Sequence, residues 1–250
     1  MKKVNATWEK RNFGFDAVEV TLSISDFAQP KKLFADLSAL AAKPQVYVLV
    51  KMPVGNLDIL HALEDQGFRF LETQFHIEKS LPGYVSPPEI SSLNYQLHKI
   101  EVPKSEELWR NIADRMTNDM FYTDRVYLDP VFPVGVSRIR YANWLMDLLH
   151  VSDSHLSIWM LEDQEISFSM VRIDEDRKVV HGILGGIFQE YQNAGLGMAV
   201  WDAGLHCHSR HGMRLSKTVI SSNNLPILRL YTYFGYRITK EMYVLRKFTA

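Results

Sequence analysis

The sequence predicts an α/β (α+β) chain, and three observations in its second half support this fold class. Val179–Phe188 is apolar and rich in β-branched residues, as expected of a buried strand. Met198–His211 instead carries large apolar side chains at helical spacing. Leu215–Ile220 and Pro226–Phe234 then repeat the order of strand and helix, and Gly235 ends the second helix.

A turn containing two glycines joins the first strand to its helix, with the sequence Gln192-Asn193-Ala194-Gly195-Leu196-Gly197. The first N–H groups of a helix lack intrahelical partners and carry partial positive charge, so they hold a pyrophosphate without any lysine. Gly195 and Gly197 let the backbone approach phosphate oxygens closely. A glycine also begins many helices simply because the chain turns tightly there, so the turn alone leaves both interpretations open.

The residues that follow resemble the GCN5-related N-acetyltransferase (GNAT) family in their spacing. Asn224, Ile227, Tyr231 and Gly235-Tyr236 fall on positions of that family's motif, although Ile227 replaces the usual alanine. The matching motifs cover about residues 179–247. The resemblance implies the GNAT fold, a mixed and mostly antiparallel sheet flanked by helices.

The resemblance also implies acetyl-CoA as cosubstrate and direct attack of an amine on the thioester, so Cys207 is not needed as a nucleophile. Tyr231 is the implied proton donor to the departing thiolate, with simple packing within its helix as the alternative. A backbone N–H in residues 186–188 is the implied donor to the oxyanion. The residues implied to hold the cosubstrate are Gly186, Ile187, Phe188, Gln192, Asn193, Ala194, Gly195, Leu196, Gly197, Asn224 and Ile227.

The catalytic base is a separate question, for which His181 is the candidate. In the histone-acetylating branch of the family a glutamate precedes the first residue of the turn by eleven positions, and this chain has His181 there. An imidazole titrates near neutrality and accepts a proton directly or through water. The alternatives are a buried, hydrogen-bonded histidine and a relay of water molecules.

Composition limits the classes of function. The 250 residues are 46% hydrophobic, enough for a substantial core, and 28 basic residues nearly balance 29 acidic ones. We therefore expect neither nucleic acid nor a membrane surface as a partner.

One cysteine excludes an intramolecular disulfide, and no apolar run has the length of a signal peptide or membrane span, so we expect a cytoplasmic protein. We also expect no metal. His206, Cys207, His208 and His211 are the candidate ligands, but no further carboxylate or thiol is evident near them in the sequence.

A copy of the closing motif lies in the first half of the chain. Residues 63–79 align without gaps with residues 231–247, and the identical pairs are Gly67 with Gly235, Arg69 with Arg237, and Lys79 with Lys247. A strand at Gln45–Met52, a helix at Leu57–Gln66, a glycine turn and two closing strands would precede the linker. Chance similarity is the alternative. The first copy lacks the glycine turn of the second and has Leu63 in place of Tyr231, so we expect it to pack against the second copy, shape the acceptor pocket or dimerise.

These observations predict a truncated GNAT-like domain at residues 1–82, a linker at 83–94 and the catalytic GNAT domain at 95–250. Within the family, this plan is similar to that of bacterial enzymes that acetylate a nucleotide-linked amino sugar, with looser matches at residues 7–15 and 121–144. The resemblance implies a small amine of this kind as the acceptor. Acetylation of a protein N-terminus or lysine, and a CoA-binding module without catalysis, are the alternatives.

An aromatic stretch at residues 121–140 is the candidate for acceptor recognition. It is predicted to be irregular, between helices at Ser105–Met116 and Ile139–His150. Aromatic faces suit a sugar or nucleobase, arginine suits a phosphate, and a carboxylate orients an ammonium group. Tyr122, Asp124 and Arg125 are the candidate residues, and covering the core is their alternative role.

Overall fold

The computed structural model describes residues 1–93 and 95–249, so the last residue of the predicted linker and the last residue of the predicted catalytic domain lie outside the described residues. The strands are β1 (Lys2–Asn5), β2 (Asp16–Thr21), β3 (Val46–Pro53), β4 (Arg69–Ser80), β5 (Leu97–Glu101), β6 (Ser154–Leu161), β7 (Gln164–Asp174), β8 (Val179–Ile187), β9 (Leu215–Ser221) and β10 (Arg237–Thr249). The helices are α1 (Lys10–Phe13), α2 (Pro30–Ala41), α3 (Leu57–Asp65), α4 (Pro88–Ser91), α5 (Glu106–Asp114), α6 (Arg125–Leu128), α7 (Val136–Leu148), α8 (Leu196–Arg210) and α9 (Leu225–Tyr233).

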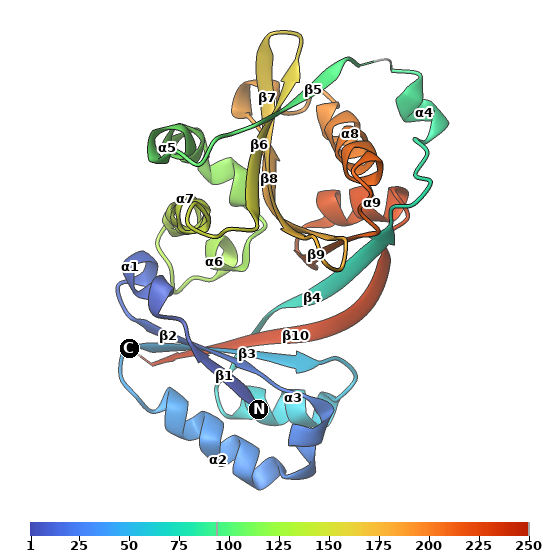
Figure 1. The fold of residues 1–250 in the computed structure, drawn as a ribbon. Coiled ribbons are helices and arrows are strands. Elements are labelled where there is room, and N and C mark those ends of the chain that lie inside the picture. Colours follow the sequence, from blue (N-terminus) through green and yellow to red (C-terminus); the bar gives the residue numbers. More distant parts are fainter. Residues whose placement is uncertain (94, 250) are drawn as a thin grey trace.

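One sheet contains all ten of these strands in the order β1-β2-β3-β10-β4-β9-β8-β7-β6-β5 (Figure 1). Among the described residues, only β2 with β3 and β8 with β9 pair in parallel, and the other neighbours are antiparallel. Figure 1 shows α5, α6 and α7 on one side of the second-half strands and α8 and α9 on the other. This arrangement confirms the predicted mixed, mostly antiparallel sheet flanked by helices.

The predicted elements around the glycine turn are present. β8 ends at Ile187, and α8 begins after Gly195, whose φ of 74° lies in the left-handed region that suits glycine. Asn224 caps α9, because its Oδ1 accepts a hydrogen bond from the backbone N–H of Ile227 at 3.3 Å. Gly235, with φ of 73°, ends α9 and leads into β10.

The two similar segments of the sequence have the same local structure. Each is a helix, a glycine with positive φ and a long strand, namely α3, Gly67 and β4 in one case and α9, Gly235 and β10 in the other. The expectation of two closing strands in each copy is wrong, because β4 and β10 each run as one strand. The register between these two strands shifts once after Ile238 of β10 and once between Phe70 and Glu72 of β4, and neither shift ends a strand.

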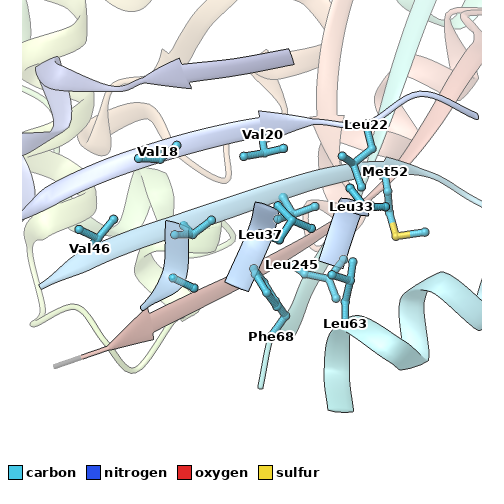
Figure 2. Packing of buried hydrophobic residues seen from close by; sticks show 13 residues of the cluster. Val18, Val20, Leu22, Leu33, Leu37, Val46, Met52, Leu63, Phe68 and Leu245 are labelled. Atoms are coloured by element: carbon cyan, nitrogen blue, oxygen red, sulfur yellow. The ribbon is translucent and has the colours of Figure 1, made fainter. Parts of the chain in front are cut away.

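The two halves of the chain exchange these strands. β10 lies between β3 and β4, and β4 lies between β10 and β9. Leu245 of β10 is consequently buried in the core of the first half, together with Leu63 and Phe68 (Figure 2). In return, Ile77 of β4 is buried in a core of the second half beside Tyr231. Each half therefore completes its hydrophobic core with a strand from the other.

Two segments predicted to be irregular contain helices. Residues 121–140 include α6 and the first turn of α7, and the linker prediction at residues 83–94 includes α4. The Asp124 side chain accepts a hydrogen bond from the N–H of Val126 and so caps the start of α6. The sequence predicted an irregular aromatic stretch here, and this cap was not recognised. In residues 1–93 and 95–249, no helix has both the length and the apolar character needed to span a bilayer.

Candidate active site

The parallel strands β8 and β9 separate soon after they begin. They pair at Val179 with Leu215, Val180 with Ser216 and His181 with Lys217. At the point of separation, Thr218 Oγ1 donates a hydrogen bond to the carbonyl of Gly182 at 3.0 Å. Beyond it, the edge of β8 that faces β9 has no β9 partner in the described ladder, so its backbone polar groups are available to a ligand.

The equivalent strands of the first half do not separate. β2 and β3 pair over six positions, from Asp16 with Val46 to Thr21 with Lys51. Their facing N–H and C=O groups are therefore used within the sheet. We call the gap that opens between β8 and β9 after His181 and Lys217 the slot. The missing glycine turn and the continuous pairing of β2 with β3 explain why the described residues of the first half form no equivalent slot.

A cavity of about 800 Å³ opens at the separation of β8 and β9 and extends to the first half of the chain. One wall is a stripe of α8 in which cavity-lining residues recur three and four positions apart, as one face of a helix requires. That stripe consists of Gly197, Val200, Trp201, Gly204, Leu205 and His208. The same cavity thus adjoins the start of α8, the edge of β8 and the side chains of the first half.

The start of α8 has room for a ligand. A Cβ atom built on Gly195 or Gly197 would meet no heavy atom within 4 Å outside its immediate neighbours, and Gly197 lines the cavity. Gln192 supports the turn from behind, because its Nε2 donates to the carbonyl of Ile187 at 3.3 Å. Open space over unpaired helical N–H groups is compatible with a bound phosphate or pyrophosphate.

Tyr231 of α9 also lines the cavity, beside the α8 wall. Its ring meets those of Trp201 and Tyr236 edge to face, each with centroids 4.7 Å apart, and only 8% of the residue is exposed. Burial raises the pKa of the Tyr231 phenol, and Tyr236 raises it further, against a smaller lowering by the Thr218 hydroxyl. The phenol therefore stays protonated at neutral pH and can donate a hydrogen bond to an anion.

The structure brings several of the predicted cosubstrate residues to one cavity. Its lining includes Gly186, Ile187, Gly197, Asn224 and Ile227. Phe188 is different, because it is fully buried and its ring packs against Phe168 and the Arg115 guanidinium, which lies 3.3 Å from the ring centroid. Its side chain is therefore part of the core. Gln192, Asn193, Ala194 and Gly195 lie in the turn before α8, Leu196 is the first residue of that helix, and none of the five lines the cavity.

His181 is not among the residues that line this cavity. It lies in β8 beside Arg172 of β7 and Lys217 of β9, before the strands separate. Burial lowers the pKa of His181, and the charges of Lys217 and Arg172 lower it further. The imidazole is thus kept neutral, but its position does not support the role of base for a reaction in the slot.

Three ion pairs line the other end of the cavity. Glu72 pairs with Arg125 at 3.4 Å, and 2% of the Glu72 side chain and 14% of the Arg125 side chain are exposed. Glu9 pairs with Arg140 at 2.7 Å, and the exposed fractions of these side chains are 4% and 13%. Glu19 and Lys51 pair at 3.1 Å. Burial raises the pKa of Glu19, but Lys51 and Arg125 lower it more, so its carboxylate stays charged. We call this part of the cavity, lined by these six residues, the polar chamber.

The predicted acceptor residues occupy different places. Asp124 and Arg125 line the cavity, whereas Tyr122 is half exposed and lies outside its lining. The Asp124 carboxylate accepts hydrogen bonds from the hydroxyls of Ser137 at 2.8 Å and Tyr141 at 3.0 Å, besides its capping bond. Asp124 is therefore already satisfied by the protein, and its first role is to hold the wall of the chamber.

The sequence prediction missed the cavity residues of the first half. Glu72, Gln74 and His76 alternate along β4 and line the cavity, and Glu19 and Lys51 join them from β2 and β3. Polar residues at every second position of a strand indicate one polar face, a signal that was present in the sequence. The sequence did not show that this face turns toward the second half, because that depends on the strand exchange.

His206, Cys207, His208 and His211 do not form a metal site in the structure. Cys207 Sγ lies 3.7 Å from Nδ1 of His211, and the same nitrogen lies 2.7 Å from the Cys207 carbonyl, so this is a contact within one turn of α8. Over residues 1–93 and 95–249, no group of three or more His, Cys, Asp or Glu side chains is arranged to hold a metal ion.

Comparison with solved structures identifies the fold. A GCN5-related N-acetyltransferase from Sphaerobacter thermophilus superposes with a TM-score of 0.58 at 15% identity, over 98% of this chain and 75% of that chain. One from Kribbella flavida gives 0.53 at 14% identity, over 93% and 81%. A GCN5-related glucosamine N-acetyltransferase region of a fungal multi-domain GH3 β-N-acetylglucosaminidase gives 0.55 at 14% identity, over 93% and 30%.

These likenesses show that the chain has the GNAT fold. No protein-family model matches the sequence. No curated protein matches it either. The fold is therefore established from structure, while the reaction has to be inferred from the residues of the cavity.

Proposed function

We propose that the protein is an acetyl-CoA-dependent N-acetyltransferase that acts on a small amine. The observation that carries the proposal is the separation of β8 and β9 beside the open start of α8, with Tyr231 in the same cavity. The thioester supplies an activated acetyl group. The GNAT fold of the solved relatives supports the same reaction class.

Each part of the slot suits one part of acetyl-CoA. The N–H groups at the start of α8 suit the pyrophosphate, and the free edge of β8 at residues 183–187 suits the amide groups of the pantetheine arm. Tyr231 is the donor to the departing thiolate. Because its pKa is raised, the phenol stabilises the thiolate by donating a hydrogen bond while remaining protonated.

We infer that the acceptor is an amino sugar, and a nucleotide-linked one is the first choice. The exposed rings of Trp8 and Trp144 line the same cavity as the polar chamber, and such rings suit the faces of a sugar. One solved relative is a glucosamine N-acetyltransferase region. The plan of the sequence is also similar to that of dTDP-fucosamine (dTDP-4-amino-4,6-dideoxygalactose) acetyltransferase, whose acceptor is of this class.

We also infer that the chain consists of two unequal GNAT-like copies, a truncated one at residues 1–82 and a catalytic one at 95–250 joined by residues 83–94. The repeated order of helix, glycine and long strand supports this division. Its functional consequence is that the first copy lines the acceptor end of the cavity through Glu19, Lys51 and Glu72.

Release of free thiol from acetyl-CoA tests the proposal. The purified protein is mixed with acetyl-CoA and with glucosamine, a nucleotide-linked amino sugar, or a peptide with a free N-terminus and lysine. We expect thiol release with an amino sugar and an acetylated product by mass spectrometry. Release only with the peptide would replace the acceptor class, and acetyl-CoA binding without release for any amine would favour a CoA-binding module without catalysis.

A further inference from the structure

We propose that His76, a residue of the first half, is the general base that removes the proton from the acceptor amine. The inference rests on the proposed function and assigns a residue to its proton transfer. It places the base on β4, the strand that the first half inserts into the sheet of the second.

The register of the sheet places His76 one strand away from the slot. His76 lies opposite Val219 of β9, and β9 is one of the two strands that form the slot. His76 and Val219 both line the cavity, and the next lining pair along the two strands is Gln74 with Ser221. Side chains at paired positions of neighbouring strands share a face, so His76 and Val219 point to the same side of the sheet.

Tyr231 approaches from the other side of the sheet. Phe75 and Ile77, which alternate with His76 along β4, pack in the core that contains Tyr231. His76 is therefore on the opposite face, toward the polar chamber. An amine that enters from the chamber meets His76 on its own side, while the thiolate meets Tyr231 on the other.

Burial and the charges around His76 favour its neutral ring. Burial lowers the pKa of His76, and Lys240 of β10 and Lys51 of β3 lower it further. Glu19, Glu72, Asp124 and Arg125 also line the cavity beside this face, and Glu78 of β4 and Lys217 of β9 lie along the same two strands. Each of these groups except Asp124 has an oppositely charged partner. A neutral imidazole is the form that accepts a proton.

Other candidate bases in the polar chamber are already engaged. Glu72 accepts hydrogen bonds from Gln74 at 2.9 Å and Arg125 at 3.4 Å, and Lys51 donates to Glu19 at 3.1 Å. For the His76 ring, no hydrogen bond is found among the described residues, and the residue is partly exposed. His76 is therefore the titratable group of this face with a free acceptor nitrogen.

The protons balance as follows. The acceptor ammonium gives one proton to the His76 imidazole, and the free amine forms a bond to the thioester carbonyl carbon as the carbon–sulfur bond breaks. The second proton that the nitrogen loses on becoming an amide goes to the thiolate, which leaves as free thiol. The imidazolium then returns its proton to solvent, so one amide, one thiol and one proton result.

The test compares the variant His76→Asn with the control His61→Asn, which changes an exposed residue of α3. The acceptor is the amine that gives the fastest thiol release with the wild-type protein, and glucosamine is tried first. For His76→Asn we expect kcat/KM at pH 7 to fall by about 10²-fold. The loss should shrink as pH rises toward the pKa of the amine, since the free amine then needs no base. The Kd of acetyl-CoA, measured by calorimetry, and all parameters of His61→Asn should be unchanged.

An unchanged rate and pH profile in a folded His76→Asn protein would overturn the assignment, as would a loss in His181→Asn instead. If the asparagine variant does not fold, NMR of the wild-type imidazoles decides: a His76 ring that stays protonated above pH 8 with acetyl-CoA bound overturns it. Absence of thiol release from the wild-type protein with every amine would overturn the proposed function itself, which is a different result from an active but unaffected variant.

Discussion

Gln74 of β4 lies opposite Ser221 of β9 in the antiparallel ladder, and both side chains line the cavity at the slot. These residues come from different halves of the chain and meet only because β4 is inserted between β9 and β10. The wall of a slot that belongs to the second half is therefore built partly by the first.

Tyr231→Phe removes the phenol and keeps the ring. We expect kcat for acetyl transfer to fall by about 10²-fold while the Kd of acetyl-CoA stays within about twofold, because the donor acts on the departing thiolate. Tyr233→Phe, two residues along the same helix, is the control, since that phenol is exposed and bonds to Glu89. Equal rates for the two variants in a thiol-release assay would exclude Tyr231 from the chemistry.

Gly197→Asp and Gly197→Asn test the position of the pyrophosphate. Both side chains fit, because no heavy atom lies within 4 Å of a Cβ at Gly197, and they differ by one charge. A carboxylate in the first turn stabilises a helix but repels a pyrophosphate, so we expect about tenfold weaker acetyl-CoA binding for Asp than for Asn at low salt. Calorimetry at low and high salt measures the difference, and identical affinities would place the pyrophosphate elsewhere.

Arg140→Gln leaves the Glu9 carboxylate buried without its cation. We expect the free energy of unfolding to fall by about 3–5 kcal/mol, since a buried charge without a partner is strongly destabilising. The double variant with Glu9→Gln should recover much of this loss. Arg110→Gln breaks the exposed pair with Glu106 and should cost less than about 0.5 kcal/mol. Urea unfolding checks all three, and a small effect of Arg140→Gln would mean that water reaches Glu9.

The pH dependence of stability should carry the signature of His208. Burial lowers the pKa of His208 to about 4, with Lys99, His211 and His155 adding to the effect. Between its ordinary pKa of about 6.5 and 4, the unfolded chain binds a proton that the folded chain does not, so stability falls as pH falls through this window. Thermal unfolding at pH 7 and pH 4.5 should show a smaller difference for His208→Gln than for wild type, and equal differences would contradict the assignment.

The sequence was sufficient for the elements that depend on local pattern. β8, α8, β9 and α9 lie within a few residues of their predicted bounds, because strand-like and helical spacing of apolar residues and the caps at Asn224 and Gly235 are local signals. The fold class followed from their order. α6 was missed because four residues offer too little periodicity to distinguish a helix from an aromatic loop.

The parts that the sequence could not show depend on contacts between distant segments. The similarity of residues 63–79 and 231–247 indicated two copies, but nothing in it indicated that β4 and β10 exchange places. Without that exchange, Glu72 and His76 could not be assigned to the cavity. Phe188 and His181 were placed from motif spacing, whereas core packing around Arg115 and the separation of β8 and β9 only after His181 decide where their side chains lie.

A crystal structure of the protein with CoA tests the central claim most directly. We predict the pyrophosphate at the N-terminus of α8 beside Gly197, the pantetheine arm along residues 183–187 of β8, and the thiol within hydrogen-bonding reach of the Tyr231 hydroxyl. CoA bound away from the separation of β8 and β9, or no binding at concentrations that saturate other proteins of this fold, would contradict the claim.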